Sequence, residues 1–256
     1  MKRINLIYFS PSGSSNSIAS EIGDNFSGDK VRYDLLRQTF EEVTFEKNEL
    51  VIFAFPVFAG RLPAICLEKI AKFKGKDTPA IGVVVYGNRD YEDALVELVD
   101  ILKENGFKTI GAGAVIAEHS IFPTMAKGRP DEKDREQILN FSNKCKDMLS
   151  LISEDMKIEV KGNRPYIDSK PIPLIPKGNS KCIKCGACVK ICPVGAISID
   201  DPKKTDKKKC ISCTACIYIC PERARGFSGP MYAAAAKTFE SKNKERKEPE
   251  FFYADK

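Results

Sequence analysis

Over the first 150 positions, short uninterrupted apolar runs alternate with longer amphipathic segments. Apolar runs of this length, bounded by polar turns, are typical of strands that are buried on both faces of a sheet. They predict strands at residues 4–9, 50–55, 80–86 and 109–117. The segment 31–36, in which apolar and polar residues are mixed, is expected to be a further strand, which gives five in all. Apolar positions spaced three or four residues apart predict helices between and after them, at residues 16–26, 64–73, 91–105 and 131–152.

Strands that alternate with helices predict an α/β fold with a doubly wound parallel sheet. For five strands we expect the order 2-1-3-4-5. Ligands bind such sheets at the carboxyl ends of the strands, near the point where the strand order reverses. The loops that follow the first, third and fourth predicted strands are therefore candidate binding loops.

The loop after the first predicted strand is rich in hydrogen-bond donors. Its residues are Ser10, Pro11, Ser12, Gly13, Ser14, Ser15 and Asn16. Serine hydroxyls and the free N–H groups of a helix N-terminus suit a phosphate group. The loop is not a P-loop, because no Gly-Lys-Ser/Thr sequence ends it. A turn that only caps the following helix is the alternative.

The loops after the third and fourth predicted strands carry aromatic residues and glycines. The earlier loop contains Pro56, Val57, Phe58, Ala59 and Gly60, and the later one contains Tyr86, Gly87, Asn88 and Tyr91. An exposed aromatic side chain can stack on a flat ring, and glycine lets the backbone approach a ligand closely. Packing between neighbouring loops, or a simple helix-start turn, is the alternative.

Eight of the ten cysteines lie in two blocks of identical spacing in the last third of the chain. Each block has the pattern C-x2-C-x2-C-x3-C-P, and the second block begins 28 positions after the first. Their cysteines are Cys182, Cys185, Cys188 and Cys192, followed by Cys210, Cys213, Cys216 and Cys220. This is the spacing of bacterial ferredoxins that bind two [4Fe–4S] clusters, and such clusters transfer single electrons.

The same pattern predicts which cysteines hold each cluster, because the fourth cysteine of a block ligates the other cluster. Cluster one takes Cys182, Cys185, Cys188 and Cys220, and cluster two takes Cys210, Cys213, Cys216 and Cys192. Zinc also binds four thiolates, but the tandem repeat with two prolines favours iron–sulfur clusters. The first residues do not resemble a signal peptide. Together with the many thiols, this predicts a cytoplasmic protein without disulfides.

The full set of motifs resembles the EFR-type ferredoxins, in which a flavodoxin-like domain is fused to a double four-iron module. The resemblance covers the whole chain. The first loop is similar to the T/S-x-T-G-x-T phosphate loop of flavodoxins, and the second is similar to their second loop. Further matching segments are Gly87-Asn88-Arg89, His119-Ser120 and Arg129-Pro130-Asp131. The resemblance implies FMN, bound by the three loops. The chain has no tryptophan, which leaves open which aromatic residue stacks on the flavin.

Two further features concern proton supply and partners. His119 is the only histidine, and next to the flavin it can supply a proton near neutral pH. A hydrogen-bonded structural histidine is the alternative. Between the cysteine blocks lie five lysines, at positions 203, 204, 207, 208 and 209. The segment Lys203–Lys209 predicts a docking site for an acidic redox partner, with a solvated loop as the alternative.

Composition and charge exclude two classes of function. No apolar run reaches the roughly 18 residues that a membrane span needs. After residue 150 the chain has 21 Lys and Arg against 13 Asp and Glu. Two clusters with four thiolates each would offset roughly four of these positive charges. We therefore expect no nucleic-acid binding from this basic excess, and no nucleic-acid motif accompanies it.

The expected domains follow from these elements. Residues 1–153 form the flavodoxin-like FMN-binding domain, residues 154–180 a linker, and residues 181–228 a small α+β domain of the 2[4Fe–4S] ferredoxin type. Residues 229–256 form a helix, expected at 231–247, and a tail. The tail contains Phe251, Phe252 and Tyr253. Three adjacent aromatic side chains rarely stay in water, so we expect them to pack on the first domain.

The predicted function is electron transfer between FMN, two [4Fe–4S] clusters and an external redox partner, by a carrier rather than a substrate-converting enzyme. One alternative is a flavin-dependent reductase of a small molecule that receives its electrons from the clusters. Another is a redox sensor whose flavodoxin-like domain binds no flavin. Flavin absorption, turnover with a small acceptor, and electron exchange with a separate carrier protein distinguish the three.

Overall fold

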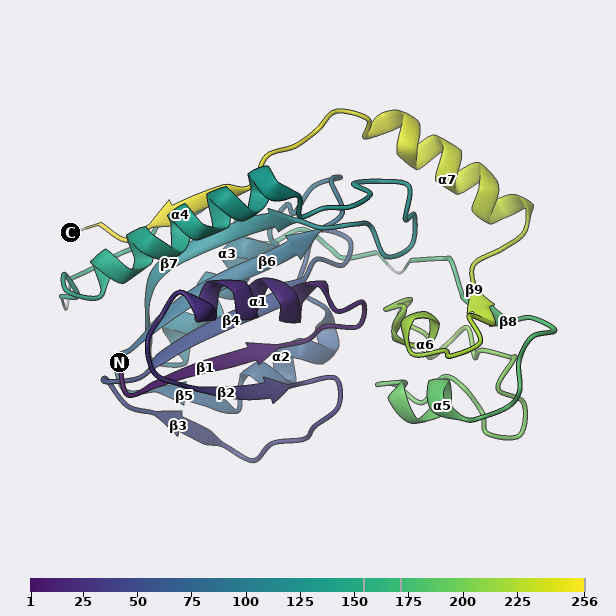
Figure 1. Ribbon diagram of the computed structural model, residues 1–256, viewed down its shortest axis with the longest axis horizontal. Coiled ribbons are helices and arrows are strands. Elements are labelled where there is room, and N and C mark those ends of the chain that lie inside the picture. The colour runs from purple at the N-terminus through teal and green to yellow at the C-terminus, as the bar shows by residue number, and fades with distance from the viewer. Residues whose placement is uncertain (154, 171, 256) are drawn as a thin grey trace.

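The computed structural model describes residues 1–153, 155–170 and 172–255. Residues 154 and 171 of the expected linker, and residue 256 of the expected tail, lie outside the described residues. The centre of the fold is a sheet with five parallel strands in the order β2-β1-β4-β6-β7 (Figure 1). These strands are β1 Arg3–Tyr8, β2 Asp29–Asp34, β4 Leu50–Pro56, β6 Thr78–Tyr86 and β7 Phe107–Ile116. Numbered along the chain, this is the predicted order 2-1-3-4-5, so the flavodoxin-like arrangement is confirmed.

Helices cover both faces of the sheet. Helices α1 Ser14–Asp24 and α4 Glu132–Met148 lie on one face, and α2 Ala64–Ile70 and α3 Ala94–Glu104 lie on the other (Figure 1). Helix α4 begins at a capping box, in which Asp131 accepts from the Asp134 N–H and Asp134 accepts from the Asp131 N–H. A capping box satisfies two backbone donors that a helix start leaves free.

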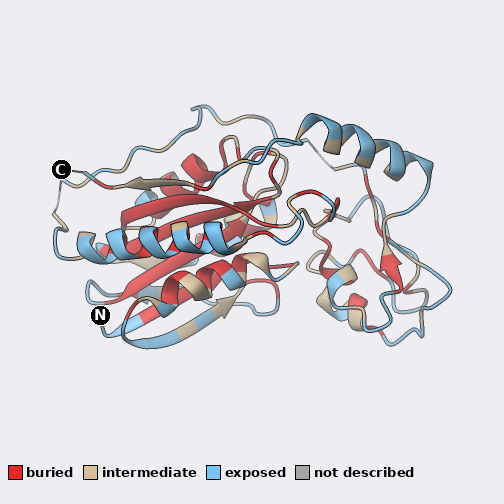
Figure 2. Ribbon diagram, turned by 45° about the horizontal axis from the view of Figure 1, so that its top comes forward, coloured by how far each residue is buried: buried red, intermediate tan, exposed pale blue. Residues whose placement is uncertain are grey.

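The strands alternate their side chains between two cores, one on each side of the sheet. In β4, Val51 and Phe53 face the core under α2 and α3, whereas Ile52 and Ala54 face the core under α1 and α4. Strands β1, β4, β6 and β7 are accordingly buried along most of their length (Figure 2). Strand β2, at the edge of the sheet, has no buried residue. Fully burying one large aliphatic or aromatic side chain stabilises the fold by about 1.5–3 kcal/mol. Burial on both faces also explains why these strands are recognisable as continuous apolar runs.

The C-terminal tail adds a sixth strand that the sequence did not predict. Strand β10 Glu250–Tyr253 pairs antiparallel with β7 at the edge of the sheet. The ring of Phe251 stacks on Phe141 of α4, with 4.5 Å between the ring centroids. The expectation that the aromatic tail packs on the first domain is therefore confirmed, and the tail does so as a strand. A short parallel pair, β3 Val43–Phe45 with β5 Phe73–Gly75, was also not predicted.

The cysteine blocks form a small module beyond the carboxyl ends of the parallel strands (Figure 1). It contains helices α5 Ala187–Ile191 and α6 Ala215–Tyr218, and an antiparallel pair of β8 Lys177–Gly178 with β9 Arg225–Gly226. Helix α7 Pro230–Lys242 follows and ends five residues before its predicted end. The chain then returns to the sheet as β10. Within the described ranges, none of the helices has the length and apolar character needed to span a bilayer.

Candidate functional site

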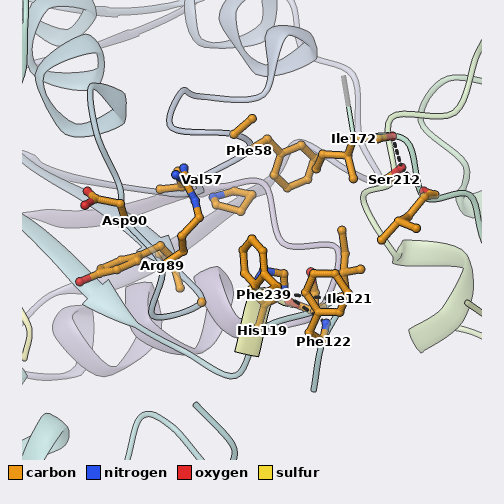
Figure 3. A pocket seen from close by; sticks show the side chains of 18 of the residues that line it. Val57, Phe58, Arg89, Asp90, His119, Ile121, Phe122, Ile172, Ser212 and Phe239 are labelled. Carbon is orange, nitrogen blue, oxygen red and sulfur yellow. Dashed lines mark hydrogen bonds between the residues drawn. The ribbon is translucent and has the colours of Figure 1, made fainter. Parts of the chain in front are cut away.

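A cavity of about 650 Å³ lies at the carboxyl ends of the strands, between the sheet and the cysteine module (Figure 3). All three predicted loops line it. Their lining residues are Ser12, Ser14 and Ser15, then Pro56, Val57, Phe58 and Ala59, then Tyr86 and Gly87. The strand order thus brings the loops together at one edge of the sheet, as a doubly wound sheet does at its switch point.

The first loop presents unpaired donors to this cavity. Gly13 adopts a left-handed conformation, with φ at 93°, and starts helix α1. Ser10 and Asn16 do not line the cavity. The Ser10 Oγ accepts a hydrogen bond from the Asn16 N–H at 3.0 Å. Among the described residues, the backbone N–H groups of Ser12, Ser14 and Ser15 have no hydrogen-bond partner. Three free N–H groups with serine hydroxyls beside them at a helix N-terminus form a suitable phosphate site.

One side-chain atom in this loop also lacks a partner. Asn16 Oδ1 is buried and accepts no hydrogen bond within the described part of the chain. A buried acceptor without a donor costs about 1–3 kcal/mol. Asn16 does not line the cavity, so this atom is enclosed by the protein itself and does not face a ligand. The fit to the phosphate of FMN therefore rests on the N–H groups and hydroxyls of Ser12, Ser14 and Ser15.

The second loop is a tight turn that presents apolar side chains. Phe58 and Arg61 exchange backbone hydrogen bonds of 2.9 and 3.2 Å, and Val57 and Phe58 line the cavity (Figure 3). Gly60 does not line it, and its φ is 81°. A residue with a Cβ is strained at this left-handed φ, so the turn favours glycine, and a Cβ would also lie 1.8 Å from Oε2 of Glu92.

Two residues of the third loop lie outside the cavity. Asn88 donates from Nδ2 to the backbone carbonyl of Asn243 at 3.1 Å and accepts from the Lys247 N–H at 3.1 Å. Tyr91 is buried, and its hydroxyl donates to the carboxylate of Glu250 at 3.1 Å. Asn88 thus binds the segment that leads into β10, and Tyr91 binds the first residue of β10. Their role in this structure is to fasten the C-terminal segment to the sheet.

His119 lines the cavity as a neutral ring. Its Nδ1 accepts from the N–H groups of Ile121 and Phe122 at 3.1 and 3.2 Å, which leaves its proton on Nε2. The ring packs against Phe122 and against Phe239 of α7 (Figure 3). Burial lowers the pKa of His119 to about 4. The ring can therefore donate a hydrogen bond at pH 7, but it carries no additional proton to supply.

The far end of the cavity is formed by residues that the sequence did not point to. They come from the linker, the second cysteine block and α7, and include Ile172, Leu174, Ser212, Met231 and Phe239. Ser212 is buried, and its hydroxyl donates to the Leu174 carbonyl at 2.6 Å. Of these residues, only Ser212 could have been suspected from the sequence, because it lies between Cys210 and Cys213 of the second cysteine block. The cavity wall is thus continuous with the second cysteine block.

The structure brings the cysteines together across the two blocks. A small cavity is lined by Cys182, Cys185, Cys188 and Cys220, which are the four predicted for cluster one. The thiol of Cys188 has a raised pKa through burial, and the nearby Cys182 and Cys220 also raise it. Its neighbours therefore include the last cysteine of the second block.

The other four cysteines show the reciprocal arrangement. Burial raises the pKa of the Cys213 thiol to about 12, with added contributions from Cys216, Cys192 and Cys210. Burial also raises the pKa of Cys210 and Cys216, and Cys192 contributes to both. The last cysteine of the first block thus lies among the first three of the second.

Backbone N–H groups point at three of the sulfurs. The N–H groups of Ala196, Ala224 and Ser212 donate to the Sγ atoms of Cys192, Cys220 and Cys210 at 3.2, 3.3 and 3.4 Å. Donors of this kind favour a thiolate and influence cluster potentials. All ten cysteines are free. Within the described residues, no group of three His, Cys, Asp or Glu side chains is arranged to hold a single metal ion.

The two cysteines outside the blocks and the five lysines between the blocks have environments that are common for their residue types. Cys66 and Cys145 are buried in the two cores, and burial raises the pKa of both thiols. Among the five lysines between the blocks, Lys203 is half-buried and the other four are exposed. Lys204 forms an ion pair with Asp201 at 3.1 Å.

Comparison with known proteins supports the iron–sulfur module. Residues 181–224 match the family model of the 4Fe-4S dicluster domain. No curated protein is similar enough to count as a relative. Solved structures with a similar fold include a flavodoxin from the domain Archaea, 11% identical over 58% of this chain and 99% of that chain, with a TM-score of 0.39. Another is an NADH:FMN oxidoreductase in its apo form, 12% identical over 60% of this chain and 92% of that chain, with a TM-score of 0.42. A third is a WrbA-like flavodoxin from Agrobacterium tumefaciens, 12% identical over 60% of this chain and 100% of that chain, with a TM-score of 0.40.

Proposed function

We propose that this protein transfers single electrons between FMN, two [4Fe–4S] clusters and an external redox partner. FMN binds in the large cavity, and the clusters bind in the two crossed sets of four cysteines. One observation carries the proposal: the wall of the cavity includes both the serines of the first loop and Ser212 of the second cysteine block. This organisation is that of the EFR-type ferredoxins, and we propose that the chain belongs with them.

The first loop binds the phosphate of FMN. The free N–H groups and hydroxyls of Ser12, Ser14 and Ser15 donate to the phosphate oxygens, and the N-terminus of α1 adds favourable electrostatics. Ser10 has a supporting role, since its Oγ holds the turn.

The middle of the cavity orients the flavin ring. Val57 and Phe58 offer an apolar surface on one side, and Tyr86, Gly87 and His119 line another part of the wall. The Nε2–H of His119 is available as a hydrogen-bond donor because Nδ1 is occupied by two backbone N–H groups. When bound, FMN supplies both one-electron and two-electron redox chemistry, whereas each cluster supplies one-electron chemistry.

The cysteine module provides thiolates and fixes their surroundings. Four thiolates per cluster leave no open iron position, so the protein acts through spacing, burial and hydrogen bonds to sulfur. Cys213 packs against the core of the sheet, and Ala215 is part of that core. Cys185 is exposed. Cluster two is therefore the internal site beside the flavin cavity, and cluster one is the external site.

Anaerobic preparation followed by spectroscopic and kinetic measurement tests this proposal. We expect one FMN and about eight irons per chain, because each four-iron cluster takes four of the eight block cysteines. Photoreduction of the flavin should then be followed by reduction of a cluster within the same molecule, at a rate independent of protein concentration. Iron without flavin, zinc in place of iron, or a rate proportional to concentration would contradict the proposal.

A reductase function is the second candidate, because the far end of the cavity is apolar. Ile121, Phe122, Ile172, Leu174 and Phe239 line this end, and apolar cavities of this size hold small organic ligands. Steady turnover of a small acceptor without a partner protein would favour the reductase. Reduction of the acceptor only in the presence of a separate carrier protein would favour the electron carrier.

A further inference from the structure

Arg225 places a buried positive charge inside the cysteine module. It is the first residue of β9 and is 4% exposed. Its Nη1 donates to the Pro202 carbonyl, and its Nη2 donates to the Pro176 carbonyl at 3.2 Å and to the hydroxyl of Thr205. These three bonds hold the guanidinium between the segments that precede the two cysteine blocks.

The described residues supply no negative partner for this charge. Among them, no Asp or Glu carboxylate forms an ion pair with Arg225. Its Nε is also buried and has no hydrogen-bond partner within the same residues. Burying a charge is costly unless the charge is paired. The guanidinium is therefore suited to an anionic group other than a carboxylate.

The cysteines of both cluster sites lie around Arg225. Arg225 lines the cavity formed by the four cysteines of cluster one. The Sγ atom of Cys188 lies 4.0 Å from the Pro202 carbonyl oxygen to which Nη1 donates. In the second set, burial raises the pKa of the Cys210 and Cys216 thiols, and the positive charge of Arg225 offsets part of this effect. One guanidinium thus adjoins both sets of cysteines.

The two cysteine blocks differ at this position. Ile197 and Arg225 each lie five residues after the last cysteine of their block, and each is 4% exposed. Ile197 packs against Cys188 and Cys216. The first block therefore has an apolar residue where the second block has an arginine, so burial at this position does not by itself require a charge.

The other charged residue near the first set of cysteines is screened by solvent. Among the described residues that line the cluster-one cavity, Glu222 and Arg225 carry the charges. Glu222 is exposed. Exposed charges are screened by water and salt, whereas buried charges are screened much less. The charge of Arg225 is therefore the stronger of the two at the cysteines.

We infer that Arg225 is the buried counter-charge of both cluster sites and raises the reduction potential of both. The inference rests on the proposed function and adds a residue that sets how readily the clusters accept an electron. A four-iron core bound by four thiolates carries a net charge of about −2, and reduction makes it more negative. A fixed positive charge in a buried site stabilises the more negative form. The Nε–H is a donor for sulfur, and hydrogen bonds to sulfur also influence cluster potentials.

A potentiometric titration of the full chain, followed by paramagnetic resonance, tests the role of Arg225. We expect Arg225→Gln to lower the reduction equilibrium constant of both clusters by about tenfold, which is about 59 mV for a one-electron centre. Loss of a charged hydrogen-bond partner has an effect of this order. Arg225→Lys keeps a positive charge beside the cysteines and should retain most of the wild-type potential.

Arg223→Gln is the matched control, because it removes the same charge two residues earlier at an exposed position. Its potentials should equal those of the wild type at high salt, where exposed charges are screened. The shift in Arg225→Gln should persist at high salt because this charge is buried. Wild-type potentials in Arg225→Gln, or equal shifts in the two glutamine variants at high salt, would overturn the inference.

Arg225→Lys decides the question if Arg225→Gln loses its iron. Iron retained at wild-type potentials would support the counter-charge, because lysine cannot reproduce the planar fork of hydrogen bonds. Loss of iron in both variants, or lowered potentials in Arg225→Lys, would show that the fork matters and the charge does not.

The outcomes also separate this inference from the proposed function. A protein with both clusters but no flavin would contradict the proposed function, and the potentials of the variants would still test Arg225. Unchanged potentials in a protein with flavin and both clusters would overturn the role of Arg225 alone. Zinc in place of iron would overturn both.

Discussion

Substituting Gly87 by alanine should displace His119 and restore an ordinary pKa to its ring. A Cβ at position 87 would lie 2.5 Å from Cδ2 and 2.6 Å from Cγ of His119. Carbon atoms do not approach this closely without bonding, so one of the two must shift. The backbone at Gly87 is outside the left-handed region, so alanine causes no backbone strain. The steric conflict with the His119 ring is therefore the only effect that we expect from this substitution.

The expected size of the change follows from the burial of the ring. The pKa of His119 is about 4, against 6.5 for a free imidazole, and burial is the main cause. This difference corresponds to about 3 kcal/mol, at about 1.4 kcal/mol per pKa unit. Because the folded pKa is depressed, the unfolded chain binds more protons between pH 6.5 and 4. The contribution to stability is complete above pH 6.5 and is lost as the pH falls toward 4.

Nuclear magnetic resonance can follow this residue without ambiguity, because the chain has one histidine. In protein labelled with ¹⁵N-histidine, the wild type should show the Nε2–H tautomer and no titration above about pH 5.5. Gly87→Ala should titrate within about one unit of 6.5. Gly226→Ala is the control, since no atom lies within 4 Å of the added Cβ. A wild-type ring that titrates near 6.5, or an unchanged ring in Gly87→Ala, would refute this reasoning.

Three further substitutions test other parts of the structure. Ser12→Asp should lower the flavin content of the purified protein, because it places a negative charge where the phosphate binds. Ser17→Asp, at an exposed position further along α1, should keep the flavin. Cys192→Ala should weaken the paramagnetic resonance signal of cluster two before that of cluster one, and selective loss of cluster one would contradict the crossed assignment. Phe251→Ala removes the ring stacked on Phe141 at 4.5 Å. It should lower the free energy of unfolding by about 2 kcal/mol in a denaturant titration, less than for a fully buried ring, and a change under about 0.5 kcal/mol would show that β10 contributes little.

The central strands could be predicted because burial on both faces leaves a continuous apolar run. All nine residues of β6 are buried, for example. Strand β10 left no such run, since its four residues are half-buried at the edge of the sheet. A sequence cannot show which strand an edge segment will pair with. A glycine of β7 makes room for the tail, because a Cβ on Gly113 would lie 2.8 Å from the Phe251 ring.

The site could be predicted in part, for a related reason. The three loops were found because strand order alone brings the carboxyl ends together. Asn88 and Tyr91 have residue types suited to a ligand, yet they bind the C-terminal segment, which no local pattern reveals. Phe239 and Leu174 reach the cavity from α7 and from the linker, far along the chain. Residues of this kind can be assigned to the cavity only when the course of the chain between the two modules is known.

The course of the chain between the two modules explains why the tail that returns to the sheet matters for electron transfer. Electron transfer slows steeply as the distance between centres grows, so the flavin cavity and the second cysteine block must keep a fixed separation. The chain meets this requirement by attaching the cysteine module to the sheet on both sides. On the entering side, Lys157 exchanges backbone hydrogen bonds of 3.1 and 2.9 Å with Asp255, next to β10. On the returning side, Asn88 binds the segment before β10. The Ser212 hydroxyl also donates to the Leu174 carbonyl, which connects the second cysteine block to the wall of the cavity. Under the proposed function, these contacts hold the donor and acceptor sites in place, so that an electron can cross without a movement of the two modules.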